Sequence, residues 1–231
     1  MDTIQAIETR HSIRRYTDQA IGETVREQLQ ACVDVNNRAS GLHIQLMTDE
    51  PQGFKGFIGR FNFKGVRNYI ALIGPDDDRL DEKCGYYGEH LLLEAVKLGL
   101  SGCWFGGGFK PVATVIAPEE RAVIAIALGY PAQEGRARKS KEFSELATIE
   151  DGSTAPEWFA RGVHAALLAP TARNQQSFHL TLLAAGKDGA PATNKPLVKA
   201  ESLGGALSQI DLGIVKYHFE IGAGTENFNW A

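Results

Sequence analysis

The chain has 231 residues, a length that suits one large domain or two small ones. It is 43% hydrophobic and 23% charged, which is ordinary for a globular protein and excludes a collagen-like chain, a disordered tail and a disulfide-rich miniprotein. Lys and Arg number 24 against 28 Asp and Glu, a net charge of −4, so any site for an anion must be local.

In the first half of the chain, apolar residues at helical spacing predict a short helix capped by Asp2 and a second helix from Gly22 to Val35. Alternation predicts a strand over 42–47, and a continuous apolar run predicts a buried strand over 69–73. A third helix is expected over 87–98, followed by a glycine-rich loop, a short helix over 111–117 and a buried strand over 123–128.

In the second half, a helix is expected from Pro156, then a polar loop over 170–177, a strand over 178–183 and a long helix through Ile210 and Ile221. The mixture predicts an α+β fold. The polar segment 150–154 has the composition of a linker, so we expect two domains, 1–152 and 153–231.

A longer repeat is visible when QACVDVNNRASGLHIQLMT is set beside AALLAPTARNQQSFHLTLLA. Both segments predict a helix, a polar loop and a strand that contains a histidine, His43 in one and His179 in the other. Coincidence and an ancestral duplication are both compatible with this similarity, because helix-loop-strand units are common and identities are few.

Two short basic segments stand out on this acidic chain. Arg10, His11, Ser12 and Arg14 lie in RHSIRR, and a second segment, 136–141, carries Arg136, Arg138 and Lys139. Guanidinium and hydroxyl groups suit phosphate oxygens. Solvated turns are the simpler interpretation of each segment alone, but two such loops can converge on one phosphate.

Two further segments have the composition of a ligand site. The glycine-rich segment contains Cys103, Trp104, Phe105, Gly106 and Gly107, where glycines allow close backbone approach and aromatic rings suit a flat ligand. The loop 170–176 offers amide and hydroxyl groups that can read a heterocycle edge. Core packing and an ordinary helix-terminating loop are the plain alternatives.

Other kinds of site are disfavoured. The glycine segment follows a helix, so it is not a dinucleotide fingerprint, and the lysine-serine pair of a phosphate-binding loop is missing. The six histidines show no metal-ligand spacing, and no G-x-S-x-G motif is present. Cys103 has no evident basic partner, so we expect a buried structural thiol.

The three cysteines are far apart and lack C-x-x-C spacing, which fits a reducing compartment. No signal-peptide stretch or membrane-length apolar run is evident. We therefore expect a cytoplasmic protein that binds neither nucleic acid nor membrane.

Taken together and in order, ETRHSIRRY, GLSGCWFGGGF, ALGYP with RARK, and APTARNQQSF resemble the FMN-dependent nitroreductase family over nearly the whole chain. The resemblance implies a mostly antiparallel sheet flanked by helices. It implies that the FMN phosphate is held by residues of the two basic segments, which are Arg10, His11, Ser12, Arg14, Arg138 and Lys139, with Arg136 as an alternative in the second.

The same resemblance assigns the flavin ring and ribityl chain. It places the glycine segment, Cys103 to Gly107, close to the flavin ring. The ribityl and ring contacts come from the loop after the helix, where the matching residues are Pro170, Thr171, Ala172, Arg173, Asn174 and Gln176. Ser177-Phe178 stands where relatives have Pro-Trp, a departure that bears on the exact shape of the pocket.

One further departure concerns order along the chain. The Asn/Gln segment ordinarily comes early, where this chain has NNRASGLH, and the matching version lies in the second half. This resembles a nitroreductase subgroup with duplicated, rearranged halves, which predicts a pseudo-dimer whose C-terminal half supplies in cis what a partner subunit supplies elsewhere. A pseudo-dimeric monomer and a homodimer both remain open.

The activity implied is that of an NAD(P)H-dependent flavoprotein oxidoreductase. NADPH or NADH would pass hydride to flavin N5, and a nitroaromatic or quinone-like small molecule would accept it in a ping-pong cycle without a catalytic side chain. The alternatives are a non-catalytic flavin-binding sensor or storage protein, and a flavin reductase acting on enones or halogenated aromatics.

Overall fold

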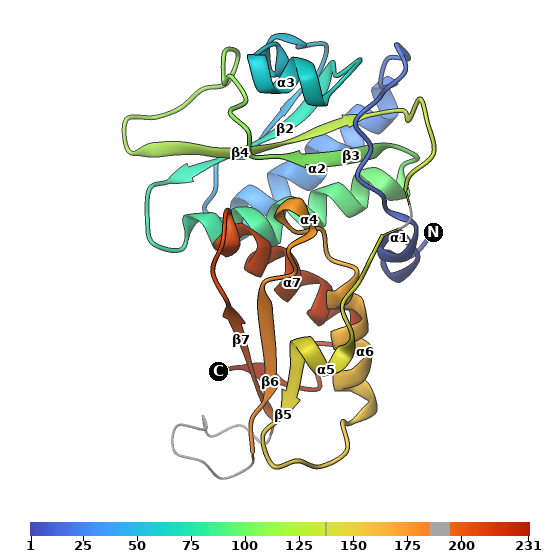
Figure 1. The fold of residues 1–231 in the computed structure, drawn as a ribbon. Helices are drawn as coiled ribbons and strands as arrows, with labels where there is room; N and C mark the ends of the chain where they lie inside the picture. Colours follow the sequence, from blue (N-terminus) through green and yellow to red (C-terminus); the bar gives the residue numbers. More distant parts are fainter. Residues whose placement is uncertain (137, 185–194) are drawn as a thin grey trace. The chain divides into compact units, whose positions relative to one another are not determined.

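The computed structural model describes residues 1–136, 138–184 and 195–231 (Figure 1). The chain forms two compact units, Met1–Ala137 and Arg138–Ala231, each with its own four-stranded sheet. The predicted α+β fold, with helices flanking a mostly antiparallel sheet, is confirmed. Within the described ranges, no helix is both long and apolar enough to cross a bilayer.

The first unit contains both helices and strands along its length. In chain order its elements are α1 (Thr3–Thr9), α2 (Glu23–Ser40), β1 (Gln45–Met47), η1 (Gln52–Phe54), α3 (Phe57–Asn62), β2 (Asn68–Pro75), α4 (Leu80–Lys97), β3 (Ser101–Phe105) and β4 (Glu120–Gly129). Asp2 caps α1 as predicted, because its side chain accepts a hydrogen bond from the Gln5 amide.

The sheet of the first unit has the order β1-β2-β4-β3, and every pair is antiparallel. Helices α2 and α4 lie on one face and α3 on the other (Figure 1). Both faces of β2 are therefore covered, which explains why its first seven residues are buried and why its sequence is continuously apolar.

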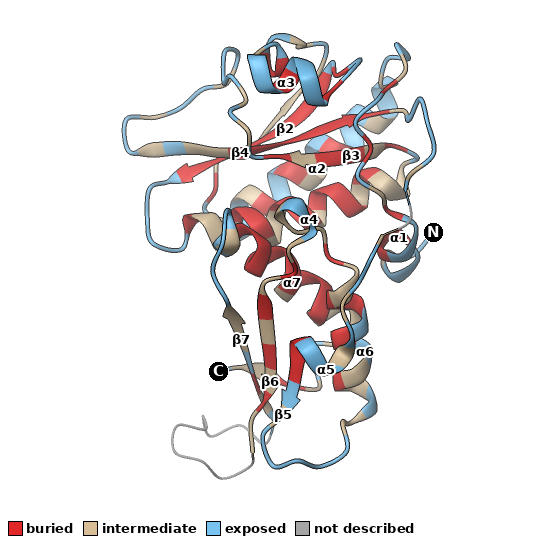
Figure 2. Cartoon of the chain, in the orientation of Figure 1, coloured by how far each residue is buried: buried red, intermediate tan, exposed pale blue. Residues whose placement is uncertain are grey.

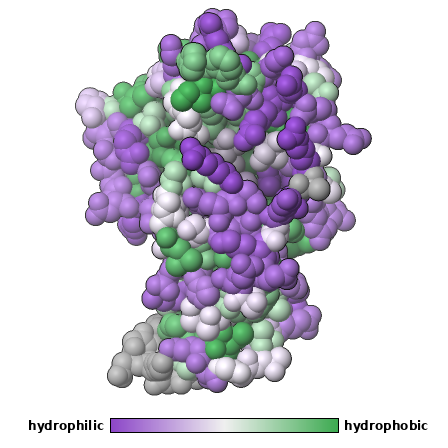
Figure 3. Space-filling model, viewed as in Figure 1, coloured by the Kyte–Doolittle hydropathy of each residue, from purple (hydrophilic) through white to green (hydrophobic). Residues whose placement is uncertain are grey.

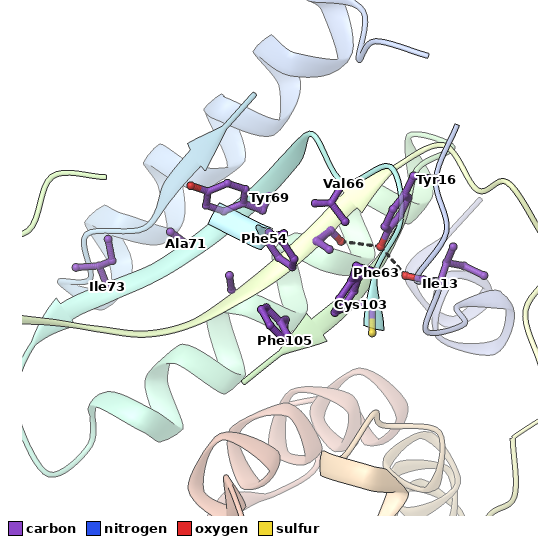
Figure 4. Packing of buried hydrophobic residues seen from close by; sticks show 12 residues of the cluster. Ile13, Tyr16, Phe54, Phe63, Val66, Tyr69, Ala71, Ile73, Cys103 and Phe105 are labelled. Atoms are coloured by element: carbon purple, nitrogen blue, oxygen red, sulfur yellow. Dashed lines mark hydrogen bonds between the residues drawn. The ribbon is translucent and has the colours of Figure 1, made fainter. Parts of the chain in front are cut away.

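On the α3 face, an aromatic cluster forms the core (Figure 4), and much of strands β2 and β4 is buried (Figure 2). Phe54 packs on Phe63 and Phe105, with ring centroids 5.2 and 4.9 Å away. Tyr16 closes one end of the cluster, and its hydroxyl donates to the Ile13 carbonyl. The cluster joins β3 to the segment that follows α1.

Three local predictions in this unit need correction. Residues 111–117 form a single turn at 112–113 and irregular backbone, not a helix. The strand predicted over 42–47 is regular only over β1, although the His43 amide still donates to the Ile73 carbonyl. The glycine-rich loop begins as strand β3, because its alternating residues pair with β4 and only the part after Phe105 leaves the sheet.

The second unit contains α5 (Phe143–Leu146), β5 (Ala147–Ile149), α6 (Glu157–Leu167), η2 (Ala172–Asn174), β6 (Phe178–Leu182), β7 (Leu197–Ser202), α7 (Ser208–Ala223) and β8 (Asn229–Trp230). Its sheet has the order β5-β6-β7-β8, with β6 and β7 antiparallel and the two outer pairs parallel.

Helices α6 and α7 pack closely in this unit. A Cβ on Gly162 would lie 2.7 Å from the Phe219 ring, and one on Gly222 would lie 2.5 Å from the Arg161 carbonyl. The two glycines thus permit the helix crossing. Strand β5 pairs with β6, so the segment before the linker-like residues 150–154 belongs to this unit. The unit boundary at 137/138 therefore precedes the predicted 152/153.

The two copies of the sequence repeat both form a helix, a loop and a strand. Strand β1 lies at the edge of its sheet, whereas β6 lies between β5 and β7. The repeat is thus matched in its local elements but not in its strand position, and the duplication of halves stays a prediction.

Candidate functional site

The basic segment after α1 runs beside the glycine-rich strand in the first unit. Ser12 forms a parallel bridge with Gly102, and the Ile13 amide donates to the Gly102 carbonyl at 3.2 Å. A Cβ on Gly102 would lie 2.8 Å from the Ala127 carbonyl of β4, so this position of β3 requires glycine. Two of the predicted site segments are therefore brought together.

Arg10 is buried, in contrast to an ordinary solvated cation. Its Nε lies 3.8 Å from Oε1 of Glu89, a carboxylate with no exposed surface. The other carboxylate oxygen of Glu89 accepts a 2.8 Å hydrogen bond from Trp104 Nε1. Glu89 thus ties the basic segment and β3 to helix α4, and charge pairing makes its burial tolerable.

The residues of this segment available to a ligand are Ser12 and Arg14, which are exposed, and His11, which is half-buried. Both Arg14 and Ser12 lie near the Cys103 thiol. Burial raises the pKa of that thiol, and the nearby guanidinium of Arg14 only partly offsets the effect. Cys103 is therefore a neutral buried thiol at physiological pH, as the sequence predicts.

An open cleft of about 430 Å³ lies beside the same segment. Arg10 and His11 line one side, and residues 131–135 line the other. A Cβ on Gly135 would lie 2.2 Å from His11 Cγ, so the loop backbone packs directly on the imidazole. Arg136, next in the chain, is exposed. Arg136 thus follows directly on the loop that shares this cleft with the first basic segment.

The glycine-rich segment presents its side chains differently from the prediction. Cys103 and Phe105 lie in the aromatic core on the α3 face, as Figure 4 shows, and Trp104 is directed toward α4. A Cβ on Gly88 of α4 would lie 2.5 Å from the Trp104 ring. What this segment can offer a flat ligand is mainly backbone, at Gly106 and Gly107 after the strand.

In the second unit, the loop of the Asn/Gln motif is bonded to the second basic segment. Asn174 Nδ2 and Gln176 Nε2 both donate to the Lys139 carbonyl, at 2.8 and 3.0 Å. Gln176 Oε1 accepts from the Lys141 amide at 2.8 Å. Arg138 Nη1 donates to the Leu168 carbonyl at 2.8 Å. These two predicted motifs are brought together as well.

The backbone of this loop is strained. Arg173, Asn174 and Gln176 have φ of 54°, 56° and 45°, values that L-residues rarely adopt. Thr171 helps to hold the loop, because its hydroxyl accepts from the Gln176 amide. Strain of this kind persists only where surrounding bonds fix the backbone, and it is concentrated at ligand sites.

A buried carboxylate anchors the start of the loop. Asp211, in the first turn of α7, accepts from the Ala172 amide at 3.0 Å and from Gln175 Nε2 at 2.8 Å. Burial raises the pKa of Asp211 to about 6, and those hydrogen bonds oppose the rise. Pro170, just before this anchor, is half-buried. The loop is thus bonded to the second basic segment at one end and to α7 at the other.

Sequence reasoning missed Glu89 and Asp211, and it left Gln175 and Lys141 without a role inside the two segments that it singled out. Glu89 carried a signal, since it is a carboxylate among the apolar positions of α4. Asp211 carried a weaker one, as an acidic residue beside Ile210 near a helix start. The partners of both residues are distant in the sequence, so the pairing itself was not visible.

Comparison with known proteins identifies the chain's relatives. A family model described as "Putative TM nitroreductase" matches residues 2–223. No curated protein matches the sequence.

Two solved structures of low identity share the fold. One, described as a "putative nitroreductase" from Thermotoga maritima, has a TM-score of 0.64 at 20% identity, over 96% of this chain and 83% of its own. Another, a "putative nitroreductase in complex with FMN" from Desulfovibrio desulfuricans, has a TM-score of 0.51 at 22% identity, over 63% of this chain and 95% of its own. The family match covers nearly the whole sequence, and this chain therefore belongs to the nitroreductase family.

Proposed function

We propose that this protein is an FMN-dependent oxidoreductase that takes electrons from NADPH or NADH and reduces nitroaromatic or quinone-like small molecules. The observation that carries the proposal is the pairing of Ser12 with Gly102, which sets a cationic segment beside the glycine-rich strand within one unit of a nitroreductase-family chain. The proposal includes the rearranged-halves subgroup that the order of motifs suggests.

The residues of the first unit fit an FMN phosphate. Ser12 and Arg14 supply exposed hydroxyl and guanidinium donors, and His11 faces a cleft whose opposite loop approaches without a side chain at Gly135. Such donors suit a dianionic phosphate. Glu134 also lines the cleft and opposes anion binding inside it, whereas Ser12, Arg14 and Arg136 are exposed outside the set of residues that line it.

Bound FMN would supply the hydride chemistry, and the protein would supply position and electrostatics. Backbone amides after β3, near Gly106 and Gly107, can donate to a flat ring. The hydrogen bond from Trp104 Nε1 to the Glu89 carboxylate holds the Trp104 side chain of β3 against helix α4. Arg10 then acts as a positioning residue, because its guanidinium is buried against Glu89.

We also propose that residues of the second unit contribute to FMN affinity in the same chain. Support comes from the match of Pro170–Gln176 to the family's Asn/Gln segment and from the strained backbone at Arg173 and Asn174. The Asn174 and Gln176 side-chain amides already donate to the Lys139 carbonyl. The exposed side chains of Arg173 and Lys139 are therefore the better candidates for direct contact with FMN.

The first experiment is to purify the full chain, record its absorbance and titrate it with FMN. A yellow protein or saturable FMN binding is expected, and absence of both overturns the proposal. Arg14→Gln should weaken binding about 10-fold or more, since a hydrogen bond to a charged group contributes roughly 1.5–3 kcal/mol. Arg38→Gln, an exposed change of the same charge on α2, should leave affinity unchanged.

Turnover separates an enzyme from a flavin-binding sensor or storage protein. Anaerobic oxidation of NADPH or NADH should depend on added nitroaromatic or quinone. Nicotinamide oxidation that responds only to an enone or a halogenated aromatic would favour that acceptor class instead. FMN binding without oxidation of either nicotinamide would establish the non-catalytic alternative.

A further inference from the structure

The helix α3 carries an aromatic surface that the proposed function leaves unused. Phe57 and Phe61 are 79% and 77% exposed, and they lie one helical turn apart with ring centroids 4.8 Å from each other. Ile58 beside them is half exposed. Figure 3 shows hydrophobic residues gathered over α3 within a largely hydrophilic surface. Exposed apolar surface of this kind commonly marks a binding site.

Three cations surround these rings. Lys55 precedes α3, Arg60 lies on it, and Lys110 comes from the loop after β3. Together with the two phenylalanines they line an open cleft of about 470 Å³, within the size range of small-molecule sites. We call Lys55, Phe57, Arg60, Phe61 and Lys110 the α3 cleft.

The charge of the α3 cleft is not neutralised by neighbours. Lys55, Arg60 and Lys110 make no ion pair among the residues that the structure describes. The nearest carboxylate along the chain, Glu50, accepts from the Gln52 and Gly53 amides and from the Tyr69 hydroxyl. Three positive charges therefore gather at one place on a chain whose net charge is −4.

The cleft is built into the fold. The Lys110 amide donates to the Gly53 carbonyl at 2.8 Å, which fixes the loop after β3 against η1. A Cβ on Gly107 would lie 2.9 Å from Ile58 Cγ2, so the glycine-rich segment packs against α3. The backbone segments that carry the cations and rings are thus held against one another.

We infer that the α3 cleft binds a planar aromatic anion, with its ring against Phe57 and Phe61 and its negative group between Lys55, Arg60 and Lys110. Stacking on exposed aromatics is tolerant of ring identity, and the cations give the preference for charge. A nucleotide and an aromatic carboxylate share this chemistry. The inference stands independently of FMN binding, because none of these residues belongs to the proposed flavin site.

The test is calorimetric titration of the purified full chain, with its FMN bound where it retains any. Adenosine 5′-monophosphate and 2-naphthoate represent the two sources of the anion, and adenosine and 2-naphthol are their neutral counterparts. Either anion should bind with saturation and more tightly than its neutral counterpart, and added salt should weaken it. The tighter anion then tells a nucleotide site from a carboxylate site.

Variants locate the binding. Each of Lys55→Gln, Arg60→Gln and Lys110→Gln should weaken binding about two- to fivefold, the range of exposed charge pairs. Phe57→Ser with Phe61→Ser should weaken it about tenfold or more. Arg38→Gln removes an exposed cation of the same unit outside the cleft and should change nothing.

Three results would overturn the inference. One is no saturable heat from either anion. Another is equal affinity for charged and neutral counterparts. The third is a sedimentation measurement in which the chain is a dimer that the double Phe variant dissociates, because a second copy would then be the occupant.

Discussion

In the first unit, the segment after α1 leaves Ser12 and Arg14 exposed beside β3 and near the Cys103 thiol, and Arg10 is buried against Glu89. In the second unit, the Asn174 and Gln176 side-chain amides both donate hydrogen bonds to the Lys139 carbonyl, and three residues of the loop adopt positive φ. The first unit keeps exposed polar side chains on a relaxed backbone, and the second uses side chains to hold a strained backbone.

That difference separates two roles for a site residue. An exposed donor is expected to affect ligand affinity with little effect on folding, whereas an internally bonded amide is expected to affect stability first. Single substitutions can therefore act on one unit at a time and be read as a change in either affinity or stability.

Glu89→Ala should cause the largest loss. It removes the buried partner of Arg10 and the acceptor of Trp104, and breaking a buried charge pair costs about 3–5 kcal/mol. Urea denaturation measures the loss in the free energy of unfolding. Glu89→Gln keeps a neutral acceptor for Trp104 and should lose less, and Glu27→Ala on the surface of α2 should stay within about 0.5 kcal/mol. A Glu89→Ala protein as stable as Glu27→Ala would contradict the internal role of Arg10.

Asp211 should make the stability of the second unit depend on pH. Its pKa is raised from 3.8 to about 6 by burial, so the folded state keeps the proton longer than the unfolded state. The stability that this group contributes is present below about pH 4 and is lost as pH rises through about 6, and the difference between these pKa values corresponds to roughly 3 kcal/mol.

Comparison with Asp211→Asn isolates this effect from other titrating groups. The free energy of unfolding of the wild type, minus that of the variant, should fall between about pH 4 and pH 7. Parallel pH profiles would mean that Asp211 has an ordinary pKa. A difference that rises with pH would mean that the hydrogen bonds from Ala172 and Gln175 outweigh burial.

Gln176→Ala should destabilise the protein by about 2 kcal/mol. The buried amide of Gln176 satisfies the Lys141 N–H, which would be left without that acceptor. Asn174→Ala is the matched control, since it removes one exposed bond to the Lys139 carbonyl, which Gln176 still contacts. Its loss should stay below about 1 kcal/mol. Chemical denaturation measures both losses. Equal losses from the two variants would show that Gln176 is not the main link between the loop and residues 139–141.

Periodicity was sufficient to predict most of the helices and the buried strands, because apolar spacing reports burial directly. It failed at the glycine-rich segment. Glycine at position 102 indicates a loop, but Gly102 is a strand residue, and it is glycine because a Cβ would clash with the Ala127 carbonyl. It failed also at 111–117, where the apolar residues Val112 and Val115 lie exposed instead of facing a core.

For the candidate site, residue types singled out the segments that pair within each unit, but not which segment pairs with which or which atoms are used. Phe105 is an aromatic in a glycine-rich segment, a pattern typical of a ligand contact, yet strand alternation directs its ring into the core with Phe54. The use of the Gln176 amide by Lys141 depends on a turn with positive φ. Such a turn lacks a signal when no glycine occupies it.

Arg173→Gly should give the smallest effect and separate strain from chemistry. Arg173 is exposed at φ 54°, and glycine there should raise the free energy of unfolding by about 0.5–1 kcal/mol, because relief of strain exceeds the added freedom of the unfolded chain. Arg173→Ala keeps a Cβ and should give no gain. If the side chain contacts FMN, both variants should lose affinity equally although only one gains stability. A stabilised Arg173→Gly protein with wild-type FMN affinity would instead show that the Arg173 side chain does not contribute to FMN binding.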